Sequence, residues 1–176
     1  MAAIIDFYRG TGTDHRGRSL EDVWSFSFAE LEAVHDFIQW LFPTVKASAF
    51  NPWAPVLDDR SIEELRAIPD LPDRLHRSLD LMLAFYGLER TITDGATVIR
   101  EASAFEDRGP RWWGAGNHNH LRLTRVIDSL RLLGLAEEAV ALERCLRGVR
   151  RRHPTGISDT TARYWVAAAG TSNVDS

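Results

Sequence analysis

Two histidines stand close together in the segment NHNHLRLTR, residues 117–125. Together with His35, the residues His118 and His120 could form a three-histidine zinc site with one open position, or could supply an imidazole for acid–base catalysis. The residues that follow have helical periodicity, and positions two apart on a helix point about 200° away from each other. Only an extended backbone would bring both rings to one ion. The spacing therefore predicts no metal and no cofactor, and it places His120 on the core side of a helix.

The same segment carries two arginines. Arg122 and Arg125 are three positions apart, which makes them neighbours on a helix surface. Two guanidinium groups near a helix N-terminus suit a carboxylate or a phosphate. The alternative is that both arginines pair with acidic side chains of the chain itself, for which the candidates are Asp36, Glu32 and Asp128. The sequence leaves these two interpretations open.

Polar side chains also interrupt an apolar segment, LEAVHDFIQWLFP, residues 31–43. Its periodicity is typical of a nearly enclosed helix. At about 100° per residue, His35 and Gln39 lie one turn apart at a margin of the apolar arc. Trp40 extends the arc, while Asp36 points towards the polar side. These polar groups either bond to the backbone of the proline-rich loop that follows, or they face a ligand.

A binding recess follows if this helix packs against the one that begins near Asn117. His35, Gln39, His120 and one arginine could then converge in a polar hollow. Its expected walls are Trp40 and the pair formed by Trp112 and Trp113.

The remaining elements are mostly helical. Ser27 and Glu30 form a capping box that begins a helix ending at Pro43. Further helices are expected from a cap at Ser61 to Pro69 and over residues 70–86, 117–133, 136–152 and 158–169, with a hairpin over residues 91–99. Residues 1–24 are expected to form an arm or loop, 48–59 a loop packed through Phe50 and Trp53, and 100–116 a connection. Five or six helices predict an all-α or mainly α fold, a single compact domain over residues 1–170 with at most one small β-hairpin and a disordered tail at 171–176.

The composition excludes several classes of protein. The net charge of -4 and the pI near 5.9 give no general attraction to nucleic acid or to an anionic membrane. The basic run RGVRRRHP ends a helix, where arginines face the dipole favourably, so we do not expect a nucleic-acid site there. No window approaches the roughly twenty apolar residues of a membrane span. With Cys145 as the single cysteine and no export signal, we expect a soluble, cytoplasmic protein.

Five blocks of sequence, in this order, resemble the conserved domain of the opioid growth factor receptor family: FYRG, LEAVHDFIQWLFP, SAFNPWAPVL, LDLMLAFYGL and NHNHLRLTRVIDSLRLLGL. The resemblance runs from Phe7 to Ala169. It implies a receptor domain for the opioid growth factor, an enkephalin pentapeptide, in a family whose animal members are associated with the nucleus and carry a long C-terminal extension. This chain looks like a short, bacterial-type member. The family brings no catalytic residues to transfer.

Together these observations predict a non-catalytic binding module for a small polar or peptide ligand, with an anionic ligand as one option. The alternatives are an enzyme that uses His35 and His120 as acid–base groups or metal ligands, and a protein or nucleic-acid adaptor. The oligomeric state is left open. The candidate ligand-binding residues are His35, Asp36, Gln39, Trp40, Asn51, Asn117, His120, Arg122 and Arg125.

Overall fold

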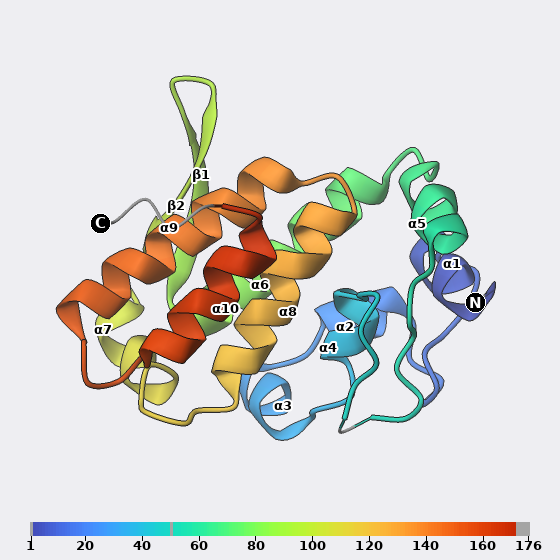
Figure 1. Cartoon of the computed structure of the whole chain (residues 1–176). Coiled ribbons are helices and arrows are strands. Elements are labelled where there is room, and N and C mark those ends of the chain that lie inside the picture. The colour runs from blue at the N-terminus through green and yellow to red at the C-terminus, as the bar shows by residue number, and fades with distance from the viewer. Residues whose placement is uncertain (1, 50, 172–176) are drawn as a thin grey trace.

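The computed structural model describes residues 2–49 and 51–171 (Figure 1). This part of the chain is mainly α, as predicted, with a single two-stranded sheet. Its α-helices are α1 (Ala2–Arg9), α2 (Leu20–Trp24), α3 (Phe28–Ala33), α4 (Ile38–Leu41), α5 (Asp59–Arg66), α6 (Leu71–Tyr86), α7 (Phe105–Arg108), α8 (Asn119–Leu132), α9 (Ala136–Arg152) and α10 (Asp159–Ala169). A 3-10 turn, η1 (Gly109–Arg111), follows α7. The predicted tail lies outside the described residues, except for Thr171, whose backbone N–H donates to the Val166 carbonyl at 3.2 Å.

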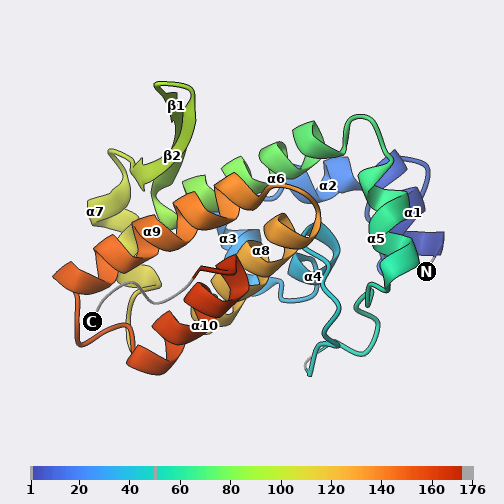
Figure 2. The same cartoon turned by 45° about the horizontal axis from the view of Figure 1, so that its top comes forward.

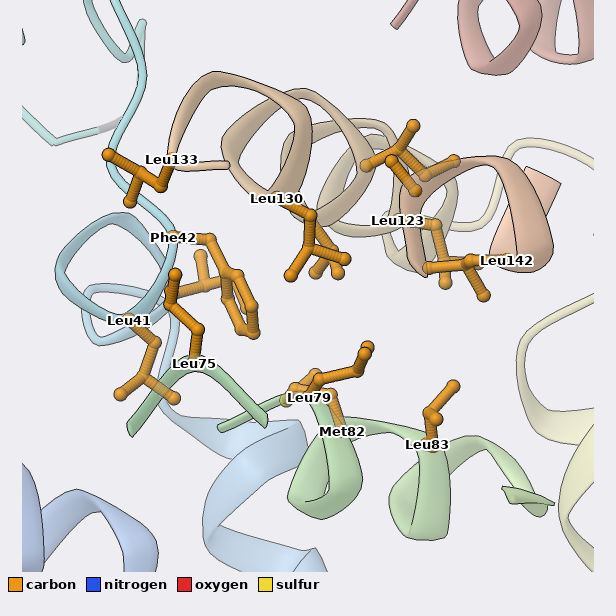
Figure 3. Packing of buried hydrophobic residues seen from close by; sticks show 14 of the residues in the cluster. Leu41, Phe42, Leu75, Leu79, Met82, Leu83, Leu123, Leu130, Leu133 and Leu142 are labelled. Carbon is orange, nitrogen blue, oxygen red and sulfur yellow. The ribbon is translucent and has the colours of Figure 1, made fainter. Parts of the chain in front are cut away.

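The four long helices form a layered C-terminal unit. In Figures 1 and 2, α8 lies between α10 on one side and α6 on the other, with α9 alongside. Figure 3 shows the reason: Leu130 of α8 points towards Leu79 and Met82 of α6, and Leu123 of α8 points to the same side, towards Leu83. All five side chains are almost completely buried. Burying a side chain of this size stabilises the fold by about 1.5–3 kcal/mol.

The predicted hairpin is present and longer than expected. Strands β1 (Leu88–Thr93) and β2 (Ala96–Glu101) pair antiparallel from Thr93 opposite Ala96 to Leu88 opposite Glu101. The turn residues Asp94 and Gly95 both have positive φ, 52° and 79°, as a two-residue hairpin turn that matches strand twist requires. The hairpin projects from the helical body beside α9 (Figures 1 and 2).

Residues 1–24 differ from the predicted arm, because they contain α1 and α2. The glycines that argued against a helix begin only at Gly10, which leaves the residues before it free to form α1. Phe7 and Tyr8 of α1 are fully buried. Ser19 and Asp22 then form a capping box that begins α2. The expectation of an ordered arm or loop was wrong for these two segments, which are helical.

The continuous helix predicted up to Pro43 is also wrong. The capping box of Ser27 and Glu30 is present, but α3 ends at Ala33, and Val34 is extended with φ -88° and ψ 130°. In a continuous helix the carbonyls of Leu31 and Val34 would accept hydrogen bonds from residues four positions later. Here the Arg122 guanidinium of α8 donates to both of them instead, at 2.7 and 2.9 Å. A tertiary contact thus replaces the helical ladder.

Smaller differences concern the connections. α5 begins before the predicted cap, because Asp58 is its N-cap and Ser61 completes the capping box. Residues 100–116 contain α7 and η1 in addition to loop. Trp53, predicted to pack onto neighbouring helices, is 71% exposed, and Phe50 falls outside the described residues.

Candidate functional site

A cavity of about 550 Å³ opens where the broken segment 34–41, the loop after α4 and the first half of α8 meet. In both overall views the start of α8 lies beside α3 and α4 (Figures 1 and 2). Carbon-rich side chains form part of the wall, and several polar and charged groups converge on it. The lining residues are His35, Ile38, Gln39, Thr44, Lys46, Ala47, Ser48, Ala49, His118, Leu121, Arg122, Thr124, Arg125 and Asp128.

The structure brings four of the nine candidate residues into this lining: His35, Gln39, Arg122 and Arg125. They come from segments more than eighty residues apart in the sequence, which meet because α8 supports the broken segment. Gln39 is 6% exposed and its amide lies 3.5 Å from the Ser48 hydroxyl and from the Asn51 amide. The break in the helix leaves His35 exposed beside the cavity.

Asp36 and Trp40 lie elsewhere. The Asp36 carboxylate accepts from Arg18 Nη2 at 2.7 Å and from Arg16 Nε at 3.1 Å, and His15 Nε2 is 3.3 Å away. Hydrogen bonds and charge from Arg18 outweigh the opposing effect of burial and lower the pKa of Asp36. Trp40 is 4% exposed and its ring stacks with His15 at a centroid distance of 6.1 Å. Both residues fix the N-terminal loops against α4.

Two polar candidates also bond to the backbone rather than line the cavity. The Asn51 side chain accepts from the Trp53 N–H at 3.0 Å. Asn117 Oδ1 accepts from the backbone N–H of Asn119 at 2.9 Å at the start of α8, which satisfies an otherwise free donor. These contacts account for both residues as turn and cap formers.

His120 faces the other side of α8 from His118, as the helical spacing predicts. It is 5% exposed and its ring meets Trp165 of α10 edge-to-face at 5.8 Å. Burial lowers the pKa of His120. An acid–base pair of His35 and His120 therefore does not form at the cavity. Within residues 2–49 and 51–171, no group of three His, Cys, Asp or Glu side chains could hold a metal ion.

The expected tryptophan walls are likewise absent from the cavity lining. Trp112 is 1% exposed and its indole N–H donates to the Tyr86 carbonyl at 2.9 Å. Trp113 stacks on His153 with ring centroids 3.9 Å apart. These rings instead pack between the end of α6 and the loop before α10.

Arg122 supports the backbone of the broken segment. It is 5% exposed, and besides the Leu31 and Val34 carbonyls it contacts Asn119 Oδ1 at 3.4 Å. Neither Asp36, Glu32 nor Asp128 pairs with it: the partners of these acids in the described residues are Arg18 and its neighbours, His118, and Arg131. Burial is the main cause that lowers the pKa of the guanidinium.

Arg125 donates hydrogen bonds through fewer of its nitrogens than Arg122 does. Its Nη1 donates to the Phe42 carbonyl at 3.3 Å and to Thr44 Oγ1 at 3.2 Å, both on the loop after α4. Burial lowers its pKa, and Asp128 opposes this effect only in part. Lys46, two positions beyond Thr44, is an exposed side chain on the same wall.

Two imidazoles stand at one side of the cavity. The rings of His35 and His118 are 5.2 Å apart, and His118 Nε2 is 3.4 Å from Glu32 Oε1. His35 Nδ1 lies 2.9 Å from the Ala33 carbonyl, so this nitrogen must carry the hydrogen that bonds to it. Burial and the charge of Arg122 lower the pKa of His118, whereas Glu32 opposes them.

Sequence reasoning missed most of the loop that completes the wall, including Thr44, Lys46 and Ser48. One signal was present: Lys46 is the only lysine in the sequence, whereas the other strongly basic residues are all arginines. Leu121, 58% exposed beside Arg122 on α8, was a second signal, because an apolar residue on the open side of a helix needs an explanation. Neither signal specifies a cavity without the fold.

The fold and the site define a mainly α-helical domain with a cavity of mixed polar and apolar lining between the broken segment and α8. The chain belongs to the opioid growth factor receptor family: the sequence model of the opioid growth factor receptor conserved region matches residues 10–169. No solved structure matches the chain. In the described residues, no helix is long and apolar enough to cross a membrane.

Several curated relatives support the assignment. The human opioid growth factor receptor is 31% identical over 159 residues, covering 86% of this chain and 23% of that protein. The mouse receptor is 34% identical over 133 residues, covering 73% and 20%. Opioid growth factor receptor-like protein 1 of Xenopus tropicalis is 31% identical over 121 residues, covering 67% and 23%. The chain therefore spans less than a quarter of the length of these relatives.

Proposed function

We propose that this domain is a binding module that takes a small polar or peptide ligand in the cavity between the broken segment 34–41 and α8. One observation carries the proposal: a cavity of about 550 Å³ in which carbon-rich walls meet a few oriented polar groups. Ligand sites commonly have this size and composition. The apolar side chains of Ile38 and Leu121 offer burial, while Arg125 and Gln39 offer directed hydrogen bonds.

The names of the relatives supply a first probe. Two of them are called opioid growth factor receptor, so the opioid growth factor peptide is the ligand to test first. A short peptide is compatible with the cavity, because its side chains can occupy the apolar part while its polar backbone meets Gln39 and the loop after α4. The receptor activity that the names of the relatives describe belongs to proteins of which this chain spans less than a quarter. For this domain it is therefore part of the proposal.

The experiment measures the melting temperature with the opioid growth factor peptide and with a library of metabolites and short peptides. A ligand that binds the folded state raises the melting temperature by mass action. Leu121→Trp places a large ring in the cavity from a side chain that is 58% exposed. Tyr164→Trp on α10 is the matched control, because Tyr164 is also 58% exposed and does not line the cavity.

We expect at least one compound to stabilise the wild-type domain and the Tyr164→Trp variant, and to lose its effect on the Leu121→Trp variant. Two results would contradict the proposal. One is that no compound stabilises the wild-type domain. The other is that both tryptophan variants respond like the wild type, which would place binding outside the cavity.

A further inference from the structure

The cations of the cavity lack the carboxylate partners that several other cations of this protein have. Arg18, Arg90 and Arg147 each hold a carboxylate at 2.9 Å or less. Within residues 2–49 and 51–171, no carboxylate forms an ion pair with Lys46, Arg122 or Arg125. The cavity therefore carries a local excess of positive charge in a chain whose net charge is -4.

The one acidic residue of the lining does not balance them. Asp128 is 9% exposed and already accepts from Arg131 Nη2 at 3.1 Å. The lining thus carries Lys46, Arg122 and Arg125 against a single carboxylate that is engaged elsewhere. A cation that is partly removed from water without a counter-charge costs free energy, and an anion from outside would offset that cost.

The three cations differ in how many of their hydrogen-bond donors have no protein acceptor in the described residues. Both terminal nitrogens of Arg122 donate to main-chain carbonyls, so this residue is committed to the fold. Arg125 uses only Nη1 within the described residues, which leaves Nε and Nη2 without a protein acceptor there. Thr44 links Arg125 to Lys46, because its hydroxyl accepts a hydrogen bond from Arg125 and lies 3.3 Å from the Lys46 carbonyl.

We propose that Arg125 and Lys46 form an anion subsite that binds the carboxylate or phosphate oxygens of the ligand, while Arg122 only positions the wall. The inference rests on the proposed binding function and specifies the chemistry of the ligand. Guanidinium groups bind such oxygens through paired, charge-assisted hydrogen bonds. The apolar remainder of the ligand then lies along Ile38 and Leu121.

The single lysine provides a selective probe. Reductive methylation with ¹³C-formaldehyde labels the Lys46 amine and the chain's α-amine while keeping the positive charge. The Lys46 signal is then followed by NMR during titration with 3-phenylpropanoate, with the neutral 3-phenylpropanamide of nearly the same shape, and with inorganic phosphate. We expect the carboxylate to shift the Lys46 signal saturably and to bind about tenfold or more tightly than the amide.

Variants test the assignment of the two groups. Arg125→Gln should weaken binding of the carboxylate by about tenfold and leave binding of the amide unchanged. Arg66→Gln is its matched control, because the Arg66 guanidinium also donates to a main-chain carbonyl, that of Leu132, but outside the cavity. Since Arg125→Gln could disturb the loop after α4, Lys46→Gln provides a second variant: Lys46 is exposed, and its removal should weaken the carboxylate without affecting folding.

The outcomes separate the two proposals. Equal affinity for carboxylate and amide overturns the anion subsite and leaves the binding module in place. The anion subsite is also overturned if neither probe shifts the Lys46 signal while a library compound still binds the wild-type domain and no longer binds the Leu121→Trp variant. If no compound binds at all, both proposals are wrong. Competition by phosphate at similar affinity supports the subsite with a phosphorylated ligand, whereas binding of the carboxylate alone supports it with a carboxylic acid or a peptide terminus.

Discussion

The two halves of this domain are stabilised in different ways. The C-terminal unit of α6 and α8–α10 consists of long amphipathic helices whose leucines pack face to face (Figure 3). The segment from α3 to the loop after α4 consists of short pieces that α8 supports through Arg122 and Arg125. The cavity lies where this second kind of structure meets α8, because an irregular backbone there leaves room and polar groups beside the helix. Three experiments test this contrast.

The largest expected effect is in the helical unit. Leu130 is fully buried in α8 and points towards α6 (Figure 3). Leu130→Ala should lower the free energy of unfolding by about 3 kcal/mol through lost apolar contact and a residual cavity. Urea denaturation measures the change. A loss below about 1 kcal/mol would show that apolar packing of α8 against α6 is not the main source of stability.

A smaller and more local effect is expected from Arg122→Met, which keeps the bulk of the side chain and removes its donors. The Leu31 and Val34 carbonyls lose their partner, so the free energy of unfolding should fall by about 2 kcal/mol. Hydrogen exchange should lose protection over residues 31–43 before it changes in α9 and α10. Uniform loss of protection through the whole domain would contradict the separate stabilisation of the two regions.

The smallest effect concerns acid. Burial lowers the pKa of His120 in the folded state below its ordinary value of 6.5. As the pH falls below that value, the unfolded chain binds the proton first, so the free energy of unfolding decreases. Repeating urea denaturation between neutral and mildly acidic pH tests this, and His120→Phe should flatten the dependence. An unchanged slope in the variant would assign the effect to other groups, of which His118 is one because its pKa is shifted in the same direction.

Periodicity and capping sufficed for the regular parts of the fold. α9 has the predicted bounds, α10 begins after the Ser158 cap, and Gly87 ends α6 in the left-handed conformation. The hairpin turn at Asp94 and Gly95 was also predicted. These features depend on residues a few positions apart, so the local sequence contains the information that forms them.

The candidate site was only partly predictable for the same reason. His35, Gln39, Arg122 and Arg125 could be selected as polar interruptions of apolar helices, and the structure places all four in the cavity lining. Trp40 could not be excluded, because its contact with His15 depends on how the N-terminal loops pack. Lys46 could not be included, because its position depends on the path of a loop.

The sequence by itself determined the mainly helical class, the long helices and the family. Only the tertiary structure decided that the segment before Pro43 breaks, because the competing hydrogen-bond donor, Arg122, lies about ninety residues away in the chain. Local propensity favours a continuous helix there. The buried Arg122 guanidinium needs hydrogen-bond acceptors, however, and it bonds to the Leu31 and Val34 carbonyls, which would otherwise accept helical hydrogen bonds. That exchange ends α3 and leaves His35 and Gln39 beside Arg125 in one cavity.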